Sequence, residues 1–305
     1  MNEPGQAITS FDQLLQSVEK RPAKVAIAAA GDLEALEALR DASRLGLAQG
    51  VLIGDVDRIQ QLAGCLQLDL REHEVIAERD TDRAADLAVQ AVASGQANLL
   101  MKGNLATAQL LRAVVDRRHG LRTARPLSHV AVLELKDQKR LIMVTDGGVN
   151  ILPDVSRKAQ IIENAVHVAH GLGFVRPRVA ILAAIESVNP EMQATVDAAM
   201  LAKMADRGQL DGAIIDGPLA LDVAISLEAS EHKHLSSPVG GQADILVAPN
   251  IEAGNILLKS IQYFAGAALA GVVVGATVPL ILLSRADRAE GKLLSIALAK
   301  RLVEN

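Results

Sequence analysis

The feature that most constrains this 305-residue chain is an alternation that continues from one end to the other. A short apolar run is followed by a turn that contains glycine or aspartate, and then by apolar residues at helical spacing. The first run covers residues 24–30, and Asp32 then opens a helical pattern that carries Leu36 and Leu39 on one side. Strands that alternate with helices predict an α/β fold with a mainly parallel sheet.

The same pattern predicts the other elements in order along the chain. The expected strands are residues 24–30, 51–53, 75–76, 98–101, 129–135, 140–145, 178–184, 212–215, 244–247, 272–274 and 280–283. The first expected helix starts at Gly31-Asp32. The later helices are expected at residues 81–92, 105–115, 156–170, 191–205, 254–269 and 287–302. Half of the residues are apolar but only 1% are aromatic, so we expect a core of Ala, Val, Leu and Ile.

The pattern changes once, in the middle of the chain. Residues 129–135 and 140–145 read as two strands with no helix between them, which predicts a hairpin. A chain of this length favours two domains over one. We therefore expect a domain boundary just before the hairpin.

An uncharged segment at residues 260–284 is long enough to span a bilayer. Gly266, Gly271 and Pro279 interrupt it, so we interpret it as the end of a helix, a turn at Gly271 and two buried strands. The first ten residues do not resemble a signal peptide. We expect a cytoplasmic protein that does not enter a membrane.

Cysteine content and net charge limit the classes of protein further. Cys65 is the only cysteine, which excludes a disulfide framework within the chain, and its apolar neighbours predict a core position. The formal charge of −5 argues against a nucleic-acid partner.

Polar residues follow almost every predicted strand. Ligands of such sheets bind beyond the carboxyl ends of the strands. Each turn taken alone is typical of ordinary turns and helix caps, but together they predict a polar cleft in which glycines allow close backbone approach. The candidates for substrate binding are Lys102, Gly103, Asn104, Asp146, Asn150, Asp216 and Asn255.

Two further segments suggest anion binding. Ser284 and Asp287 have the spacing of a capping box, but Arg285 between them is not needed for a cap and is well placed to bind an anion. Arg122 lies in a loop with other arginines, which is typical of a solvated face and is also compatible with a phosphate contact.

Several signatures are missing from the sequence. There is no G-x-G-x-x-G, no G-x-x-x-x-G-K-[ST] and no G-x-S-x-G. His232 and His234 lie in a charged run without cysteines, so we expect no metal site there.

These residues resemble the phosphate acetyltransferase and phosphate butyryltransferase family. The MKGN and SRAD motifs are more similar to the butyryl branch than to the acetyl branch. The resemblance covers about residues 98–302. It is carried by MKGN (101–104), GLRTARPLSHVAV (120–132), TDGGVNILPD (145–154), NAVHVAHGLG (164–173), DGAIIDGPLALDVAIS (211–226), PNIEAGNILLKSI (249–261) and VPLILLSRADRAEGKLLSIALA (278–299).

The resemblance implies two α/β domains, as in the isocitrate and isopropylmalate dehydrogenase fold, with the active site between them. The first domain would contain residues 1–127 and 272–305, and the second would contain 128–271. The implied reaction moves an acetyl or butyryl group between coenzyme A and inorganic phosphate in a ternary complex. Coenzyme A would be a substrate, no metal or bound cofactor would be needed, and the chain would form a homodimer or a larger homo-oligomer.

The family's Ser-Arg pair matches Ser284 and Arg285. The serine would assist the transition state, and the arginine would bind the phosphate end of the acyl phosphate. The acetyl branch has an acid seven residues beyond this serine, where this chain has Gly291. Glu290 and Asp287 are therefore both candidates for the base that deprotonates the thiol.

Two alternatives remain open from the sequence. A nicotinamide- and metal-dependent dehydrogenase of related fold could use Asp146, Asp154 and Asp216 to hold a divalent ion. A non-catalytic binding protein would keep the cleft, and Gly291 would be its sign.

Overall fold

The computed structural model describes residues 7–118, 120–135, 140–282 and 289–304. The chain has a mixed α/β fold that divides into two compact units. We call Asp12–Arg125 together with Ala270–Asn305 the terminal unit, and Pro126–Leu269 together with the segment ending at Phe11 the central unit. The expected domain boundaries at residues 127 and 272 stay a prediction.

The terminal unit contains a sheet that is parallel except at one edge. Its strands are β1 (Ala23–Ala28), β2 (Ala48–Gly54), β3 (Glu74–Ala77), β4 (Leu99–Lys102), β10 (Ala268–Val274) and β11 (Leu280–Ile281). Their order is β3-β2-β1-β4-β11-β10, and β10 runs antiparallel to β11. Because β1 pairs with both β2 and β4, it is almost entirely buried.

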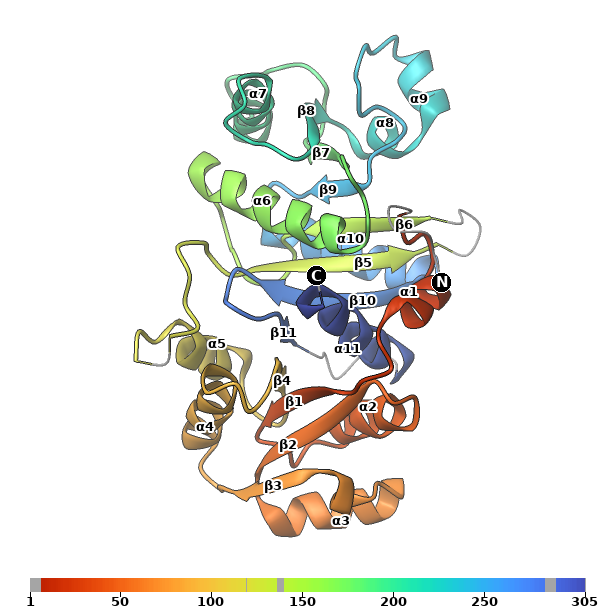
Figure 1. Cartoon of the computed structure of the whole chain (residues 1–305). Helices are drawn as coiled ribbons and strands as arrows, with labels where there is room; N and C mark the ends of the chain where they lie inside the picture. Colours follow the sequence, from red (N-terminus) through yellow and green to blue (C-terminus); the bar gives the residue numbers. More distant parts are fainter. Residues whose placement is uncertain (1–6, 119, 136–139, 283–288, 305) are drawn as a thin grey trace. The chain divides into compact units, whose positions relative to one another are not determined.

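Helices cover both faces of this sheet. They are α1 (Phe11–Ser17), α2 (Leu33–Arg44), α3 (Val56–Leu66), α4 (Thr81–Ala93), α5 (Thr107–Val115) and α11 (Ala289–Val303), with a 3₁₀ turn η1 at Leu70–Glu72. Helices α4 and α5 lie on one face, and α2 and α11 pack together on the other (Figure 1).

The start of α2 shows how the sequence produces these helices. Asp32 accepts a hydrogen bond from the Ala35 amide at 2.9 Å, a cap that contributes about 1 kcal/mol. Leu36 and Leu39 are fully buried, which adds roughly 1.5–3 kcal/mol for each side chain. The predicted start of this helix is confirmed.

The central unit contains the predicted hairpin. Its strands are β5 (Ser128–Glu134), β6 (Leu141–Thr145), β7 (Arg178–Leu182), β8 (Ile214–Leu219) and β9 (Ile245–Val247), in the order β5-β6-β9-β7-β8. Strands β5 and β6 pair antiparallel, whereas β6, β9, β7 and β8 run parallel to one another. The hairpin is therefore confirmed, and parallel pairing resumes after it.

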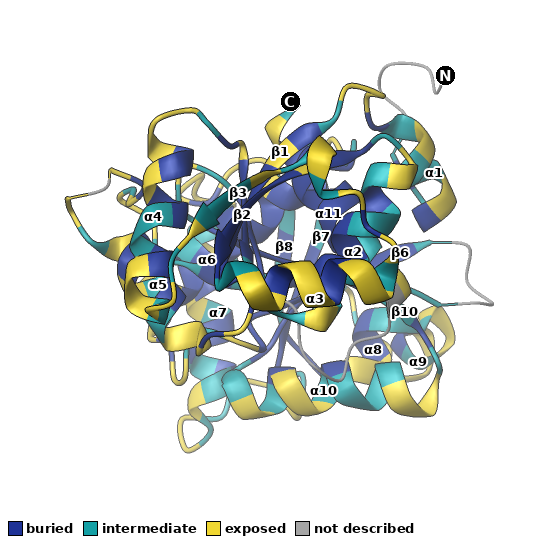
Figure 2. Ribbon diagram, turned by 90° about the horizontal axis from the view of Figure 1, so that it is seen from below, coloured by how far each residue is buried: buried dark blue, intermediate teal, exposed yellow. Residues whose placement is uncertain are grey.

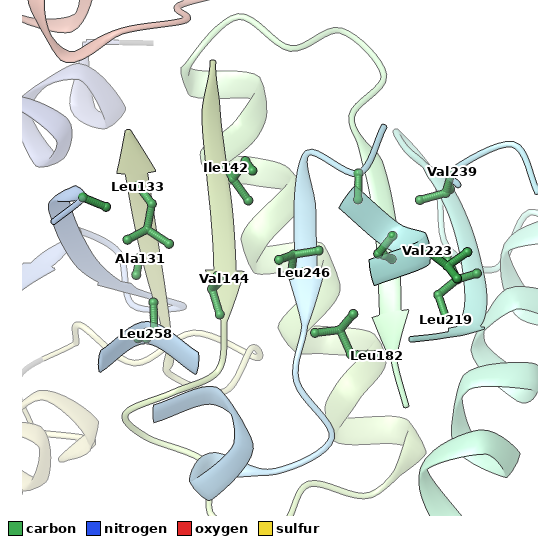
Figure 3. Close-up of a cluster of buried hydrophobic side chains, with 14 residues drawn as sticks. Ala131, Leu133, Ile142, Val144, Leu182, Leu219, Val223, Val239, Leu246 and Leu258 are labelled. Carbon is green, nitrogen blue, oxygen red and sulfur yellow. The ribbon is translucent and has the colours of Figure 1, made fainter. Parts of the chain in front are cut away.

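The helices of the central unit are α6 (Val155–Gly171), α7 (Gln193–Asp206), α8 (Leu221–Ile225), α9 (Leu227–His232) and α10 (Ile251–Phe264). Helix α6 and helix α10 lie on opposite faces of the sheet (Figure 1). On the α10 face, Leu133, Val144 and Leu246 form one aliphatic cluster with Leu258 of α10 (Figure 3). This cluster confirms the expected core of aliphatic side chains.

The predicted helix at residues 254–269 is wrong at its end. Helix α10 stops at Phe264, and strand β10 already begins at Ala268. Gly266 has a φ of +62°, a left-handed conformation that ends a helix at low cost for glycine. The turn expected at Gly271 is also wrong, because Gly271 lies within β10 and its amide donates to Ser295 Oγ at 2.9 Å.

The core position predicted for Cys65 is wrong as well. The sequence pattern did not predict α3, whose buried side is formed by Ile59, Leu62 and Ala63. Cys65 follows Ala63 by two residues, about 200° around the helix, and is exposed. Figure 2 shows the exposed outer side of α3 in yellow.

The uncharged segment that begins at residue 260 does not form one long helix, because it passes from α10 into β10. Among the residues that the structure describes, none of the helices combines the length and the apolar character that a bilayer crossing needs.

Candidate functional site

The turn after β4 places three of the predicted residues side by side in the terminal unit. The Gly103 amide donates to Ala28 O at 2.9 Å, and the Asn104 amide donates to Ala29 O at 2.8 Å. A Cβ atom on Gly103 would come within 2.7 Å of Ala28 O, so glycine is required at this position. The turn is therefore fixed to the end of β1, and Asn104 remains exposed.

Lys102 is the last residue of β4 and is half-buried. Its Nζ donates to Gly103 O at 2.9 Å and to Leu105 O at 3.3 Å. These bonds hold the ammonium group over the turn that it precedes, which meets the expectation that a lysine at the end of a buried strand needs a partner.

A pocket of about 310 Å³ adjoins this turn. It lies where β1, β2 and β3 end, and Asn104 contributes to its wall together with Gly31, Gly54, Asp55, Arg58, Glu78, Arg79 and Thr81. Arg79 forms ion pairs with Asp55 at 3.3 Å and with Asp57 at 2.7 Å. The pocket has the position expected for a ligand site in such a sheet.

Arg122 lies beside the segment that leads from β10 to β11. It forms an isolated antiparallel bridge with Ala276, and the Thr277 amide donates to Leu121 O at 2.9 Å. The Thr123 hydroxyl donates to Gly275 O at 2.5 Å. The exposed Arg122 is thus held against residues 275–277 of this segment.

Ser284, Arg285 and Asp287 lie outside the described residues. Glu290 is described, and it is exposed in the first turn of α11. Ser295 anchors this turn, because its Oγ donates to Gly291 O at 2.8 Å and accepts from the Gly271 amide of β10 at 2.9 Å. The start of α11 is therefore fixed to β10.

Sequence reasoning missed Lys292, which follows Glu290 by two residues. Lys292 is only 2% exposed, its ammonium group has no hydrogen-bond acceptor among the described residues, and its Nζ is not one of the fully buried polar atoms. The aliphatic part of the side chain is therefore buried while the ammonium group keeps some access to the surface. The signal that could have revealed it is a lysine within the otherwise apolar run of α11.

In the central unit, the turn after β6 is organised by Asp146, which is 3% exposed. Its carboxylate accepts from the amides of Gly148 at 2.9 Å, Val149 at 3.0 Å and Asn150 at 3.1 Å. It also accepts from Asn150 Nδ2 at 2.6 Å, and the same Nδ2 donates to Leu127 O at 2.8 Å. Asp146 and Asn150 are thus brought together, and their visible role is to shape this turn.

Helix α10 packs directly on the same turn. A Cβ atom on Gly147 would meet the Gly254 carbonyl carbon at 3.0 Å, so both residues must be glycine for the two segments to touch. Asn255 is exposed, and its Nδ2 donates to Gly147 O at 3.2 Å. Three predicted residues, Asp146, Asn150 and Asn255, therefore belong to one cluster.

Asp216 does not join this cluster. The sequence placed it just after a strand, but β8 continues to Leu219 and Asp216 lies within it. Its carboxylate accepts from the Gly217 amide at 2.8 Å and from Ser237 Oγ at 2.5 Å. Since β9 and β7 separate β8 from β6, Asp216 organises a different loop.

The carboxylates considered for a divalent ion have separate structural partners. Asp154 accepts from the Arg157 amide at 2.7 Å and caps α6, while Asp146 and Asp216 hold the two loops described above. Within the described ranges, no three side chains of His, Cys, Asp or Glu are arranged to hold a metal ion.

Comparison with known proteins places these residues in context. The family model described as "Phosphate acetyl/butaryl transferase" matches residues 74–300. The chain is 44% identical over 299 residues to the phosphate butyryltransferase of Clostridium acetobutylicum, and the match covers 98% of this chain and 99% of that protein.

Solved structures agree with this match. A branched-chain phosphotransacylase from Enterococcus faecalis V583 superposes with a TM-score of 0.82 at 35% identity, covering 93% of this chain and 99% of the other. A 4-hydroxythreonine-4-phosphate dehydrogenase from Klebsiella pneumoniae superposes with a TM-score of 0.58 at 14% identity, covering 92% and 99%. The second likeness shows the fold alone, which is the dehydrogenase-like fold expected from the sequence.

Proposed function

The chain belongs to the phosphate acetyltransferase and phosphate butyryltransferase family, and we propose here how its residues carry out the reaction of that family. The protein is a phosphate acyltransferase that converts acyl-coenzyme A and inorganic phosphate to acyl phosphate and coenzyme A. The observation that carries this conclusion is 44% identity along 98% of the chain to a phosphate butyryltransferase.

The reaction is a transfer between two nucleophiles. A phosphate oxygen attacks the thioester carbonyl, the carbon–sulfur bond breaks, and the departing thiolate takes up a proton. In the reverse direction the thiol must lose its proton before it attacks, because a thiol with a pKa near ~8.5 is mostly protonated at neutral pH. Direct transfer in a ternary complex needs no acyl-enzyme, and coenzyme A enters as a substrate.

Ser284 and Arg285 are proposed to act on the reacting atoms. The hydroxyl of Ser284 would donate to the oxyanion that forms on the carbonyl carbon, and the planar fork of Arg285 would bind two phosphate oxygens. Lys292 is proposed as a second cation for the phosphate, since it follows Glu290 by two residues and its ammonium group has no acceptor among the described residues.

The base is proposed to be Glu290 or Asp287. Gly291 stands where the acetyl branch has its acid. The exposed position of Glu290 in the first turn of α11, which Ser295 anchors, favours Glu290 of the two.

The remaining predicted residues are proposed to bind the substrates. In the terminal unit, Lys102, Gly103, Asn104 and Arg122 would contact phosphate groups. In the central unit, Asp146, Asn150, Asp216 and Asn255 would shape the loops that contact the substrates, which is supported by their bonds to loop backbone and side chains.

One assay tests the function. The protein is treated with a chelator and mixed with acetyl-, propionyl- or butyryl-coenzyme A, and the release of free thiol is followed with and without inorganic phosphate. Phosphate-dependent release is the expected result, and the ranking of the three donors defines the acyl chain length. If no donor gives release, the chain is not an acyltransferase and a non-catalytic binding role takes its place.

The dehydrogenase alternative is not favoured. Its support is a likeness at 14% identity, whereas the acyltransferase relative is 44% identical along almost the whole chain.

We also propose that the protein is a cytoplasmic homo-oligomer. Helix α10 supports an interface, because Ile256, Tyr263 and Phe264 are exposed on it, Phe264 by 91%. Figure 2 shows the exposed side of α10 in yellow. Light scattering of the purified protein measures the assembly, and a monomer at all concentrations would contradict it. The single cysteine supports a reducing compartment, which cell fractionation can check.

A further inference from the structure

A pocket of about 470 Å³ lies in the central unit where three helices begin. Asp154 and Val155 belong to the start of α6, Gln193 and Ala194 to the start of α7, and Asn250 caps α10. Helices α6, α7 and α10 follow strands β6, β7 and β9. The pocket is therefore at the carboxyl edge of the sheet, and none of the residues proposed for the reaction contributes to its wall.

A buried ion pair forms part of the pocket wall. Lys158 Nζ lies 2.6 Å from Asp197 Oδ2, and the two side chains are 5% and 6% exposed. Gln193 Nε2 donates to Asp197 Oδ1 at 2.7 Å. Each oxygen of Asp197 thus already has a donor, while Lys158 donates to Asp197 alone within the described part of the chain.

The hydrogen bonding of Lys158 is incomplete. An ammonium group has three N–H donors, and buried donors are normally satisfied. A second buried lysine, Lys300, offers a comparison. Its Nζ donates to Glu19 O and to Arg21 O and lies 3.5 Å from Glu304 Oε1, so it has three acceptors. Lys158 has one acceptor among the described residues, and the pocket lies beside it.

The start of α7 adds a positive partial charge to that of Lys158 at the pocket. Helix α7 begins at Gln193 without a side-chain cap and without an acid in its first turn, so no side chain of that turn offsets the N-terminal partial charge. The carboxylate of Asp154 also contributes to the wall, but its Oδ1 accepts from the Arg157 amide and caps α6.

The rest of the wall is apolar. Leu152, Pro153, Val155 and Pro249 contribute to it. We propose that this pocket binds the oxyanion group, phosphate or carboxylate, of a small organic molecule, with Lys158 Nζ as the donor. The site goes beyond the acyl transfer proposed above.

Calorimetric titration of the whole protein with inorganic phosphate, and separately with butyrate, tests the site. The titrations are made in an Arg285→Ala background, which weakens phosphate binding at the proposed reaction site, and the effect of each pocket variant is measured against this background. The double variant Lys158→Met/Asp197→Leu removes both charges and leaves neither buried alone. Ala194→Leu narrows the pocket without changing the ion pair, and Lys203→Met, an exposed lysine on the same helix, is the control.

The expected result is that one or both anions bind in the Arg285→Ala background and that the double variant and Ala194→Leu each weaken this binding by roughly 10–100-fold. Lys203→Met leaves it unchanged. Binding of phosphate alone assigns a phosphoryl ligand, and binding of butyrate alone assigns a carboxylate. The proposal is overturned if neither anion binds, or if binding is unchanged in both pocket variants. In either case water accepts the remaining hydrogen bonds of the Lys158 ammonium group. No acyl-coenzyme A is present, so the result is independent of the thiol-release assay.

Discussion

Gly254 lies so close to Gly147 that a Cβ atom on Gly254 would be 3.0 Å from the Gly147 Cα atom and 2.6 Å from Asp146 O. The two glycines belong to α10 and to the turn after β6. Their contact is what allows a helix start and a polar turn to share one surface. The cluster of Asp146, Asn150 and Asn255 depends on it.

Gly254→Ala is expected to push α10 away from this turn. Overpacking of this kind costs about 1–3 kcal/mol, and we expect the free energy of unfolding in urea to fall by that amount. The matched control is Gly64→Ala in α3, where an added Cβ atom meets nothing within 4 Å. Glycine-to-alanine in an open helix position should stabilise by roughly 0.5–1 kcal/mol. Equal effects of the two substitutions would contradict the contact.

Arg285→Ala is expected to raise the KM for phosphate and to lower kcat, because the phosphate would lose the bidentate cation that we propose for it. A loss of roughly 100–1000-fold in kcat/KM is expected for a group that stabilises the transition state. Steady-state kinetics in both directions measure it. Arg71→Ala is the control, since Arg71 is 90% exposed and pairs with Asp69. Unchanged constants for Arg285→Ala would remove this residue from the mechanism.

Lys292→Met and Lys300→Met are expected to have opposite signatures. The first removes an ammonium group that has no acceptor in the described part of the chain and is not fully buried, so stability should hold while the KM for phosphate rises about 10-fold. The second leaves Glu19 O and Arg21 O without their donor, so stability should fall by about 1–3 kcal/mol with KM unchanged. A loss of stability without a change in KM for Lys292→Met would make Lys292 a structural residue.

Glu290→Gln and Asp287→Asn identify the base. Removal of a general base is expected to slow thiol attack on acyl phosphate by roughly 100–10,000-fold and to abolish the fall in rate at low pH. The pH–rate profile of each variant is compared with that of the parent protein. The variant that keeps the acidic limb does not carry the base, and if both keep it, neither residue does.

The pH dependence of stability should contain a contribution from His73. Its Nδ1 accepts from the Gly50 amide at 2.9 Å, and burial lowers the pKa of His73 below 6.5. Above pH 6.5 the imidazole is neutral in both states, so the stability is fully present. As the pH falls below 6.5, the unfolded chain binds the proton first, and stability is lost until the pH reaches the folded pKa.

Urea denaturation between pH 8 and pH 5 measures this loss. The slope is expected to reach at most about 1.4 kcal/mol per pH unit for one proton. His73→Asn keeps an acceptor for the Gly50 amide and should flatten the curve by this contribution. His232→Asn changes an exposed histidine and serves as the control. A curve that His73→Asn does not alter would exclude His73 as the cause.

The alternation of strands and helices could be read from the sequence because hydrophobic period and turn residues agreed. The start of α2 at Asp32 and the hairpin of β5 and β6 are examples. The junction of α10 and β10 could not be read, since residues on both sides of Gly266 are apolar and offer no contrast between the two periods.

The candidate site was predictable only as a set of turns. Sequence position indicated that Asp146 and Asn150 follow a strand, but not that four donors occupy the Asp146 carboxylate. Asp216 was misplaced because β8 continues through a glycine and a proline, which normally end a strand. The pair of Lys158 and Asp197 is separated by 39 residues, and only the fold brings it together.

The pairing of β4 with β11 joins Leu100 to Leu280, and residues 126–269 of the central unit are encoded between them. A ribosome therefore synthesises residues 126–269 before the strand that completes the sheet of the terminal unit exists. The central unit can therefore fold first. During that time the edge of β4 that later pairs with β11 has no partner strand. Nascent chains stalled between residues 269 and 280 should be the forms that most need a chaperone.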